Sequence, residues 1–355
     1  MRSRILFSTS IVLFFFVVGF QANCEKKTTT VSSVKVTAVD PALFLKENLL
    51  GDVVMEDCQL SDGTKTQCYK ISVKGTPGEH KMGPWCPENI KDDKEKGGIW
   101  FRDGKVYDVD GKFIANLDEF YSDPKWKLYR EDGSINVTKT QAACEAAARP
   151  DVAAEYNNYC VECAPGFYAN LKTVYLIPIN PIYQENISAT SGRPPGGGGP
   201  PAGERPPRGE RPPGDRPPGG GQPGGGGQPY GLALNGVRFD PPAPLNAILD
   251  AHTLAPLDDC GGHVNPHEGY HYHAATGCSK EAAAKNKHSS LLGYALDGFG
   301  IYARADKDGK EPADLDQCGG HTDANIGYHY HAGKPGDNQV IGCFRGPTGS
   351  VQVTK

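Results

Sequence analysis

The sequence predicts a mainly β protein that is braced by disulfides and carries an internally duplicated, histidine-rich C-terminal region. Three observations lead to this fold class. The segment LDDCGGHVNPHEGYHYHA at 257–274 returns as LDQCGGHTDANIGYHYHA at 315–332 with a constant offset, since 318 − 260 = 58. The chain has 11 cysteines, spread over its whole length. Short apolar runs broken by Asp-Gly pairs, which favour tight turns between strands, recur through the first half.

The N-terminus predicts export. Arg2 and Arg4 precede an apolar run at 5–20 that is short for a membrane span but suits a secretory signal. Small residues allow cleavage after Gly19 or after Cys24, so we interpret residues 1–24 as a signal peptide. No comparable apolar run follows. We therefore expect a secreted, extracellular protein with no transmembrane segment.

Cysteine parity agrees with an oxidising compartment. After residue 24, six cysteines precede a proline-rich stretch and four follow it, and even numbers in an exported chain favour disulfides over thiolate metal sites. We expect pairing of Cys58 with Cys68, Cys260 with Cys278 and Cys318 with Cys343, while Cys86, Cys144, Cys160 and Cys163 pair among themselves. Cys160-x-x-Cys163 is expected to bridge to two different partners rather than form a redox or zinc motif.

Residues 41–170 are predicted to form a cysteine-rich, β-rich N-terminal region. The sequence between Cys58 and Cys68 indicates a hairpin, and 99–114 indicates a meander around Asp-Gly turns at 103–104 and 110–111. One helix is expected at 140–149, capped by Thr138 or Thr140 and ended by Pro150.

Residues 192–229 consist almost wholly of Gly, Pro, Arg, Glu, Asp and Gln. Such a composition cannot bury apolar surface, so we expect a disordered segment. The runs on either side, at 172–183 and 230–242, are both strand-like. We therefore predict an insertion between two strands of one sheet, within a domain at 171–355.

Charge excludes two classes of partner. The net charge is −5, and basic residues outside the proline-rich stretch do not cluster with aromatics. We expect neither nucleic acid nor an anionic membrane to be a partner. The motifs at Asn136-Val-Thr138 and Asn186-Ile-Ser188 predict N-glycosylation if the host is a eukaryote.

The duplicated segment gathers six histidines into two matching triplets, His263, His271 and His273 and then His321, His329 and His331. Because strand side chains alternate, each Tyr-His-Tyr-His places two imidazoles on one face and two phenol rings on the other. Neutral imidazole suits Zn, Cu, Fe and Ni. The alternative, hydrogen-bonded core histidines, explains two identical sets poorly. We predict sites for copper or zinc, between which the sequence does not choose.

Several roles around the triplets stay open. Asp258 and Asp316 could accept an imidazole N–H or could simply form turns. His267 and His288 have no counterpart in the other copy and are expected at the surface, while His80 and His252 are expected to be structural. The triplets could share one site or form two, and we favour two equivalent sites.

The CGGH and GYHYH motifs of both copies, the segment Tyr294-Ala-Leu-Asp-Gly-Phe-Gly-Ile-Tyr302 and the Gly-Cys pair near the C-terminus together resemble the YHYH-domain family of secreted proteins. The resemblance covers 230–347, and the run at 174–181 is similar to the family's first strand. It implies a secreted, metal-binding β domain and supplies no catalytic residue.

Three function classes follow. The first is a metal-binding protein for uptake, storage or a matrix. The second is an extracellular metalloenzyme, which needs an open ligand position and an acid or base, here Tyr270, Tyr272, Tyr328, Tyr330 or Asp297. The third is a metal-free structural module that binds a glycan or a protein.

Overall fold

Strands dominate the computed structural model, which describes residues 34–148, 152–185, 228–243, 249–278, 280–283 and 288–354. The strands are β1 (Val54–Gln59), β2 (Lys65–Val73), β3 (Ile99–Arg102), β4 (Lys105–Asp108), β5 (Lys172–Pro178), β6 (Gly231–Ala233), β7 (Arg238–Phe239), β8 (Gly262–Asn265), β9 (Gly269–Tyr272), β10 (Leu291–Ala295), β11 (Gly300–Tyr302), β12 (Gly320–Asp323), β13 (Gly327–His331) and β14 (Ser350–Thr354). Three short helices accompany them in the described ranges, α1 (Gly111–Ala115), α2 (Leu117–Tyr121) and α3 (Gln141–Ala147). The protein is mainly β, as predicted.

The largest sheet has eight strands in the order β12-β13-β11-β10-β6-β7-β9-β8. This order reads as two equal halves that meet at the antiparallel pair of β6 and β10, where Leu232 lies opposite Tyr294. Both hairpins at the centre carry Gly-x-Ala-Leu-Asx-Gly, at 231–236 and at 293–298. The duplication therefore includes a hairpin as well as the histidine segment, and the two halves are related by a pseudo-two-fold axis through β6 and β10.

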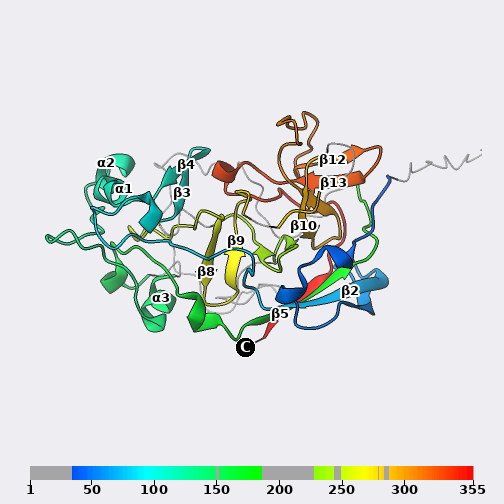
Figure 1. Cartoon of the computed structure of the whole chain (residues 1–355), viewed down its shortest axis with the longest axis horizontal. Helices are drawn as coiled ribbons and strands as arrows, with labels where there is room; N and C mark the ends of the chain where they lie inside the picture. Colours follow the sequence, from blue (N-terminus) through cyan, green and yellow to red (C-terminus); the bar gives the residue numbers. More distant parts are fainter. Residues whose placement is uncertain are drawn as a thin grey trace, which may run out of the picture. The chain divides into compact units, whose positions relative to one another are not determined.

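The second sheet has four strands in the order β1-β2-β5-β14 (Figure 1). Strand β5 pairs with β2 and β14, while β6 and β7 belong to the eight-stranded sheet. The prediction that the strands flanking 192–229 share one sheet is therefore wrong. Strand β5 alternates exposed or half-buried and buried residues, so it covers the core with one face, whereas β10 is buried along its whole length as a central strand must be.

The N-terminal region matches its sequence prediction in most elements. Strands β1 and β2 form the expected hairpin, and β3 and β4 turn at Asp103-Gly104. The prediction of a second turn at 110–111 is wrong, because Asp110 instead caps the N-terminus of α1, where its Oδ1 accepts a hydrogen bond from the N–H of Phe113 at 2.6 Å. Helix α3 begins after Thr140, whose hydroxyl oxygen accepts from the N–H of Ala143.

Five disulfides join ten cysteines in the described part of the chain, Cys58–Cys68, Cys86–Cys160, Cys144–Cys163, Cys260–Cys278 and Cys318–Cys343. All three predicted pairs are confirmed. The neighbours Cys160 and Cys163 bridge to different partners, as expected. In each copy, therefore, a disulfide joins the cysteine of the CGGH motif to a cysteine that follows the histidine segment.

The N-terminal region braces the first copy of the repeat directly. Ile99 and Leu257 exchange backbone hydrogen bonds of 2.7 and 3.1 Å, and the indole Nε1 of Trp85 donates to the carbonyl of Gly262 at 2.9 Å. From Val34 onward the chain forms one compact unit. The proposed boundary near residue 170 stays a prediction.

Three predictions lie wholly or largely outside the described residues: the signal peptide at 1–24, the disordered segment at 192–229 and the glycan acceptor Asn186. Among the residues that the structure does describe, no helix has the length and apolar character needed to cross a membrane.

Candidate metal centres

The first triplet converges at one edge of the large sheet. His263 on β8 lies opposite His271 on β9 in the antiparallel register, and His273 follows β9 on the same face. The three Nε2 atoms are 3.1 Å (His263 to His271), 3.1 Å (His271 to His273) and 3.2 Å (His273 to His263) apart. We call these three residues cluster 1.

The second triplet repeats this arrangement at the opposite edge, on β12 and β13. The Nε2 atoms of His321, His329 and His331 are separated by 3.1, 3.1 and 3.2 Å. A fourth imidazole joins them, because Nε2 of His288 lies 3.0 Å from Nε2 of His329. We call these four residues cluster 2. The prediction that His288 is a surface histidine is wrong. It stands outside the duplicated segment, just before β10, so the repeat gave no signal for it.

The separations fit a common metal ion. Two ligand atoms bonded at about 2.0–2.1 Å to one ion are roughly 3.4 Å apart in a tetrahedron and roughly 2.9 Å apart at right angles in an octahedron. The triplet distances of 3.1–3.2 Å lie between these values. The candidate ligand atoms of each cluster all lie within 4.8 Å of one another, so each group could hold a metal ion.

Hydrogen bonds at Nδ1 fix the tautomers of three rings in cluster 2. Nδ1 of His329 donates to the carbonyl of Gly327 at 2.9 Å, and Nδ1 of His331 donates to that of Ala303 at 2.8 Å. Nδ1 of His321 donates to Oδ1 of Asp314 at 2.8 Å. Carbonyl and carboxylate oxygens only accept, so these three neutral rings hold their one proton at Nδ1. Nδ1 of His288 lies 3.1 Å from the carbonyl of Ser289 and 3.2 Å from its hydroxyl, which can donate to it. Three Nε2 lone pairs, those of His321, His329 and His331, therefore point at one another.

Cluster 1 has nearly the same constraint. Nδ1 of His271 donates to the carbonyl of Gly269 at 2.9 Å, and Nδ1 of His273 donates to that of Pro241 at 2.6 Å. Their Nε2 lone pairs face each other at 3.1 Å. His263 can donate one proton to only one of them, so the triangle cannot be closed by hydrogen bonds between neutral rings.

Burial lowers the pKa of five of the imidazoles in the two clusters and so favours their neutral form. It lowers the pKa of His329 to about 3 and that of His331 to about 4. In cluster 1, burial lowers the pKa of His263 and His271 well below the usual value and also lowers that of His273, and the neighbouring rings add to the first two shifts. A neutral imidazole is the form that binds a metal.

The CGGH motif shapes the strand entry in both copies. Gly261 and Gly319 have φ of +79° and +80°, a conformation that side chains disfavour. A Cβ at Gly262 would lie 2.6 Å from the hydroxyl of Tyr270, and one at Gly320 would lie 2.2 Å from that of Tyr328. The first glycine of each motif is therefore needed for the turn, and the second leaves room for the tyrosine ring that packs against it.

The aspartates of the motif bind this tyrosine and the turn. Oδ1 of Asp258 accepts from the N–H groups of Cys260 and Gly262, and Oδ2 accepts from the hydroxyl of Tyr270 at 2.9 Å. Asp316 makes the corresponding bonds, with Tyr328 at 2.9 Å. The turn-forming role is confirmed for both residues, and the role as an imidazole acceptor is wrong.

The tyrosines and Asp297 lie behind the clusters rather than in them. Tyr270 and Tyr328 bond the motif aspartates, Tyr272 accepts from Nδ2 of Asn235 at 2.9 Å, and Tyr330 donates to Asp297 at 2.6 Å. Burial raises the pKa of all four phenols far above the usual value. These groups hold the strand face opposite the histidines and are poorly placed to act on a bound ion.

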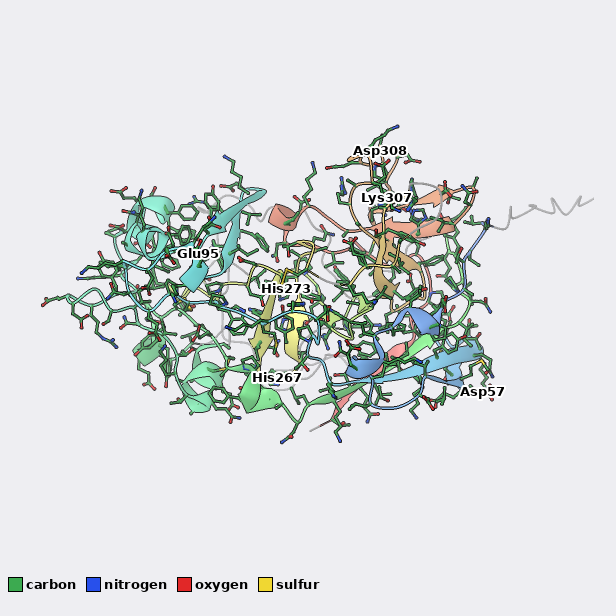
Figure 2. All side chains as sticks on the ribbon, in the orientation of Figure 1. Asp57, Glu95, His267, His273, Lys307 and Asp308 are labelled. Atoms are coloured by element: carbon green, nitrogen blue, oxygen red, sulfur yellow. A yellow bond between two sulfur atoms is a disulfide. The ribbon has the colours of Figure 1, made fainter. Side chains whose placement is uncertain are left out.

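The remaining histidines follow their predictions. His267 is exposed at the turn between β8 and β9, at the other end of the hairpin from His273 (Figure 2). His252 pairs with Asp123 at 2.8 Å, and His80 packs on Tyr272. None of the three belongs to either cluster.

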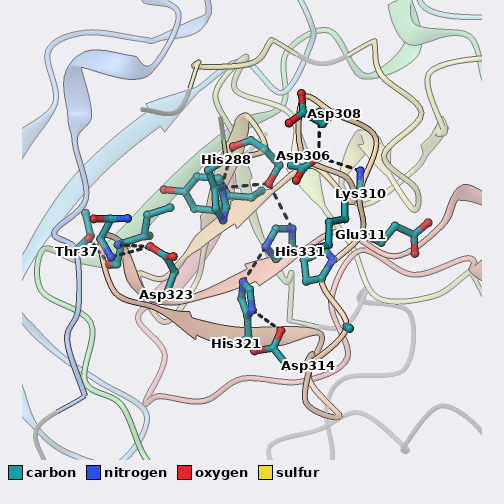
Figure 3. Close-up of a pocket in the computed structure, with 16 residues that line it drawn as sticks. Thr37, His288, Asp306, Asp308, Lys310, Glu311, Asp314, His321, Asp323 and His331 are labelled. Carbon is teal, nitrogen blue, oxygen red and sulfur yellow. Dashed lines mark hydrogen bonds and ion pairs between the residues drawn. The ribbon is translucent and has the colours of Figure 1, made fainter. Parts of the chain in front are cut away.

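A pocket of about 960 Å³ adjoins cluster 2. Its lining includes His288, His321 and His331, with the aromatic ring of Tyr302 and several carboxylates around them (Figure 3). Molecules from solvent can therefore reach the edge of this cluster.

A family model described as YHYH protein matches residues 220–314. The matched segment contains cluster 1, both central hairpins and His288. It ends just before the second copy of the histidine segment, at 315–332. Comparisons with curated proteins and with solved structures give no match. Over residues 220–314 the chain is therefore similar to the YHYH protein family.

Proposed function

We propose that the protein binds one transition-metal ion at each histidine cluster and works outside the cell as a metal-binding protein. The observation that carries this proposal is the set of three Nε2 lone pairs of His321, His329 and His331 in cluster 2, each left unprotonated by a hydrogen bond at Nδ1. Lone pairs at 3.1–3.2 Å repel one another unless a cation lies between them. The low pKa values of His329 and His331 argue against a proton as that cation at neutral pH.

Copper and zinc are the ions we propose. Both ions accept three or four imidazole ligands and do not require a thiolate ligand. The residues that would hold the ion are His263, His271 and His273 in cluster 1 and His321, His329 and His331, joined by His288, in cluster 2. Second-sphere acceptors support them, since a backbone carbonyl or a carboxylate fixes most of these rings.

An extracellular location is part of the proposal. Five disulfides are typical of chains that fold in an oxidising compartment. The basic and apolar N-terminus of the sequence supports export.

Elemental analysis of the purified protein tests the metal directly. Protein stripped with a chelator and then dialysed against Zn²⁺ or Cu²⁺ should hold about two ions per chain. His271→Gln/His273→Gln should hold one, and His329→Gln/His331→Gln should also hold one. His267→Gln is the matched control, because this exposed histidine lies in the same hairpin, and it should keep two. Wild-type protein that takes up neither ion would contradict the proposal.

A metalloenzyme is the second candidate, and the pocket beside cluster 2 favours it. Catalysis would need a ligand position open to that pocket. Azide added to Cu²⁺-loaded protein tests this requirement, because binding to the ion would change its visible absorption. An unchanged spectrum would leave a storage or transport role. If no ion binds, the remaining interpretation is a metal-free structural module.

A further inference from the structure

The internal repeat makes the surroundings of the two clusters comparable residue by residue. At the constant offset of 58, Asp323 on β12 corresponds to Asn265 on β8, since 323 − 58 = 265. Each follows a cluster histidine by two positions in its strand, His321 or His263, so both side chains lie on the histidine face. A carboxylate therefore stands beside cluster 2 where an amide stands beside cluster 1.

The turn that joins the two strands of each hairpin does not require this charge. Oδ1 of Asp323 accepts hydrogen bonds from the N–H groups of Asn325 at 2.7 Å and Ile326 at 3.1 Å. Oδ1 of Asn265 makes the two corresponding bonds at 2.9 and 2.8 Å. Because an amide oxygen holds the same turn as a carboxylate oxygen, the negative charge of Asp323 is not needed for the fold of the hairpin.

Asp323 lines the pocket of about 960 Å³ that adjoins cluster 2. Five carboxylates contribute to the lining, and Figure 3 shows them around three histidines of the cluster. One of the five, Glu311, is paired with Arg304 at 3.0 Å and with Lys334 at 3.5 Å. The charged residues of the lining are Asp306, Asp308, Lys310, Glu311, Asp314 and Asp323. Carboxylates outnumber cations among them, so the pocket is acidic at neutral pH.

We propose that this pocket is the route by which a divalent cation enters cluster 2, and that the charge of Asp323 attracts the ion. This inference rests on the proposed metal-binding function. The candidate ligand group of cluster 2 consists of its four histidines, so Asp323 acts through its charge and not as a ligand. Its carboxylate is close enough to His288 and His329 for an electrostatic interaction.

The pocket leads to buried imidazole nitrogens. His331 is only 2 % exposed, yet it lines the pocket. Its Nε2 lies 3.1 Å from Nε2 of His329, which is fully buried. An acidic surface alone attracts cations without specificity, whereas this one adjoins two nitrogens whose protons are held at Nδ1. A cation drawn into the pocket therefore meets ligands that can bind it.

The charge matters because the ligands themselves are neutral. Neutral imidazoles have no net charge with which to attract a distant cation. Carboxylates that line a recessed pocket raise the local concentration of cations and the rate at which they associate, and dissolved salt screens this effect. The rate of ion binding to cluster 2 should therefore depend on ionic strength and on Asp323.

A protein that retains only cluster 2 isolates this route. His263→Gln/His271→Gln/His273→Gln removes cluster 1 from the full-length chain. The metal-free protein is mixed with Cu²⁺ in a stopped-flow instrument, and binding is followed by the quenching of intrinsic fluorescence. The association rate constant should fall as the ionic strength rises from about 0.01 M to about 0.15 M, because the Debye length shortens from roughly 30 Å to roughly 8 Å.

Asp323→Asn in this protein introduces the residue that the first hairpin carries at the equivalent position, so the turn should keep its two hydrogen bonds. We expect an association rate constant roughly three- to tenfold lower at low ionic strength, and a weaker dependence on salt. The number of ions bound at equilibrium should not change. Asp52→Asn is the matched control, because it removes one charge from an exposed residue outside the pocket lining and should leave the rate unchanged.

Lys310→Gln tests the same electrostatic effect in the opposite direction. Lys310 is exposed and contributes a positive charge to the pocket lining. Removal of this charge should raise the association rate constant by roughly twofold or more at low ionic strength. A variant that merely disturbed the fold would not bind the ion faster.

The outcomes distinguish this inference from the function it rests on. A cluster 2 protein that binds neither Cu²⁺ nor Zn²⁺ at equilibrium would overturn both. Stoichiometric binding at the same rate in the parent protein and in a folded Asp323→Asn variant would overturn the entry route and leave the proposed function standing.

Discussion

The hydroxyl of Tyr330 donates to Oδ2 of Asp297 at 2.6 Å, in a contact where both residues are fully buried. The N–H groups of Arg345 and Gly346 donate to the same oxygen at 3.2 and 3.1 Å. In the other half of the sheet the equivalent residue is Asn235, which cannot ionise and donates to Tyr272 instead. At this one position, therefore, only the second half carries a carboxyl group that can ionise.

This difference predicts a pH-dependent stability for one residue. Burial raises the pKa of Asp297 from 3.8 to about 7. Between these values the folded chain keeps a proton that the unfolded chain releases, so the contribution of Asp297 to stability is present at low pH and is lost as the pH rises towards 7, by at most about 4 kcal/mol. Denaturant unfolding of metal-free wild type and Asp297→Asn should show a difference in free energy that shrinks from pH 5 to pH 8. A difference independent of pH would contradict the assignment.

The histidines have the opposite sign. The pKa values of His329 and His331 are lowered from 6.5 to about 3 and about 4. Below pH 6.5 these histidines are protonated in the unfolded chain but stay neutral in the folded chain. The metal-free protein should therefore lose stability as the pH falls from 6.5 to 4, and above pH 6.5 these groups should not change its stability. His329→Gln/His331→Gln should flatten this slope in chelator-treated protein. Equal slopes in the two proteins would show that these rings do not carry it.

The second glycine of the CGGH motif should not tolerate a side chain. In Gly320→Ala the new methyl would lie 2.2 Å from the hydroxyl of Tyr328 and force the ring away from Asp316. We expect a loss of about 1–3 kcal/mol in unfolding free energy. Gly166→Ala is the control, because a Cβ there meets nothing within 4 Å. Thermal unfolding monitored by circular dichroism compares the two, and equal midpoints would contradict the packing role.

If the protein is expressed in a eukaryotic host, we expect only one of the two N-glycosylation motifs to be modified. Nδ2 of Asn136 donates to the carbonyl of Asn158 at 3.1 Å, and the hydroxyl of Thr138 is buried against the carbonyl of Glu162 at 2.6 Å. A glycan at Asn136 would break these contacts, so we expect Asn186 to carry the sugar. Intact mass should fall in Asn186→Gln and stay the same in Asn136→Gln after correction for the substitution. A glycan found on Asn136 would refute this expectation.

Local sequence patterns predicted the elements whose partners are close in the chain. Three features depend only on residues that are close in the sequence. They are the hairpin closed by Cys58 and Cys68, the capped helix after Thr140 and the convergence of each histidine triplet. The sequence did not predict the pairing of β5 with β2 and β14, because the residues of a strand do not indicate which distant strand it pairs with.

His288 was missed for a related reason. It reaches cluster 2 because β11 pairs in parallel with β13 and β10 pairs antiparallel with β11, which brings the start of β10 beside the histidine strand. A sequence signal did exist for the wider duplication. The Gly-x-Ala-Leu-Asx-Gly motif occurs at 231–236 and again at 293–298, and this repeat predicts that each triplet is accompanied by a further hairpin.

The pseudo-two-fold axis has a consequence for how the two clusters can change. Identical subunits that met through β6 would have to alter both of their sites with every substitution, because symmetry copies each change. In this chain the two halves are covalently joined and differ in sequence. His288 can therefore join cluster 2, and the carboxylate of Asp240 can lie beside His271 of cluster 1, without a matching change across the axis. Fusion of a symmetric pair into one chain thus permits two centres of one architecture to specialise independently.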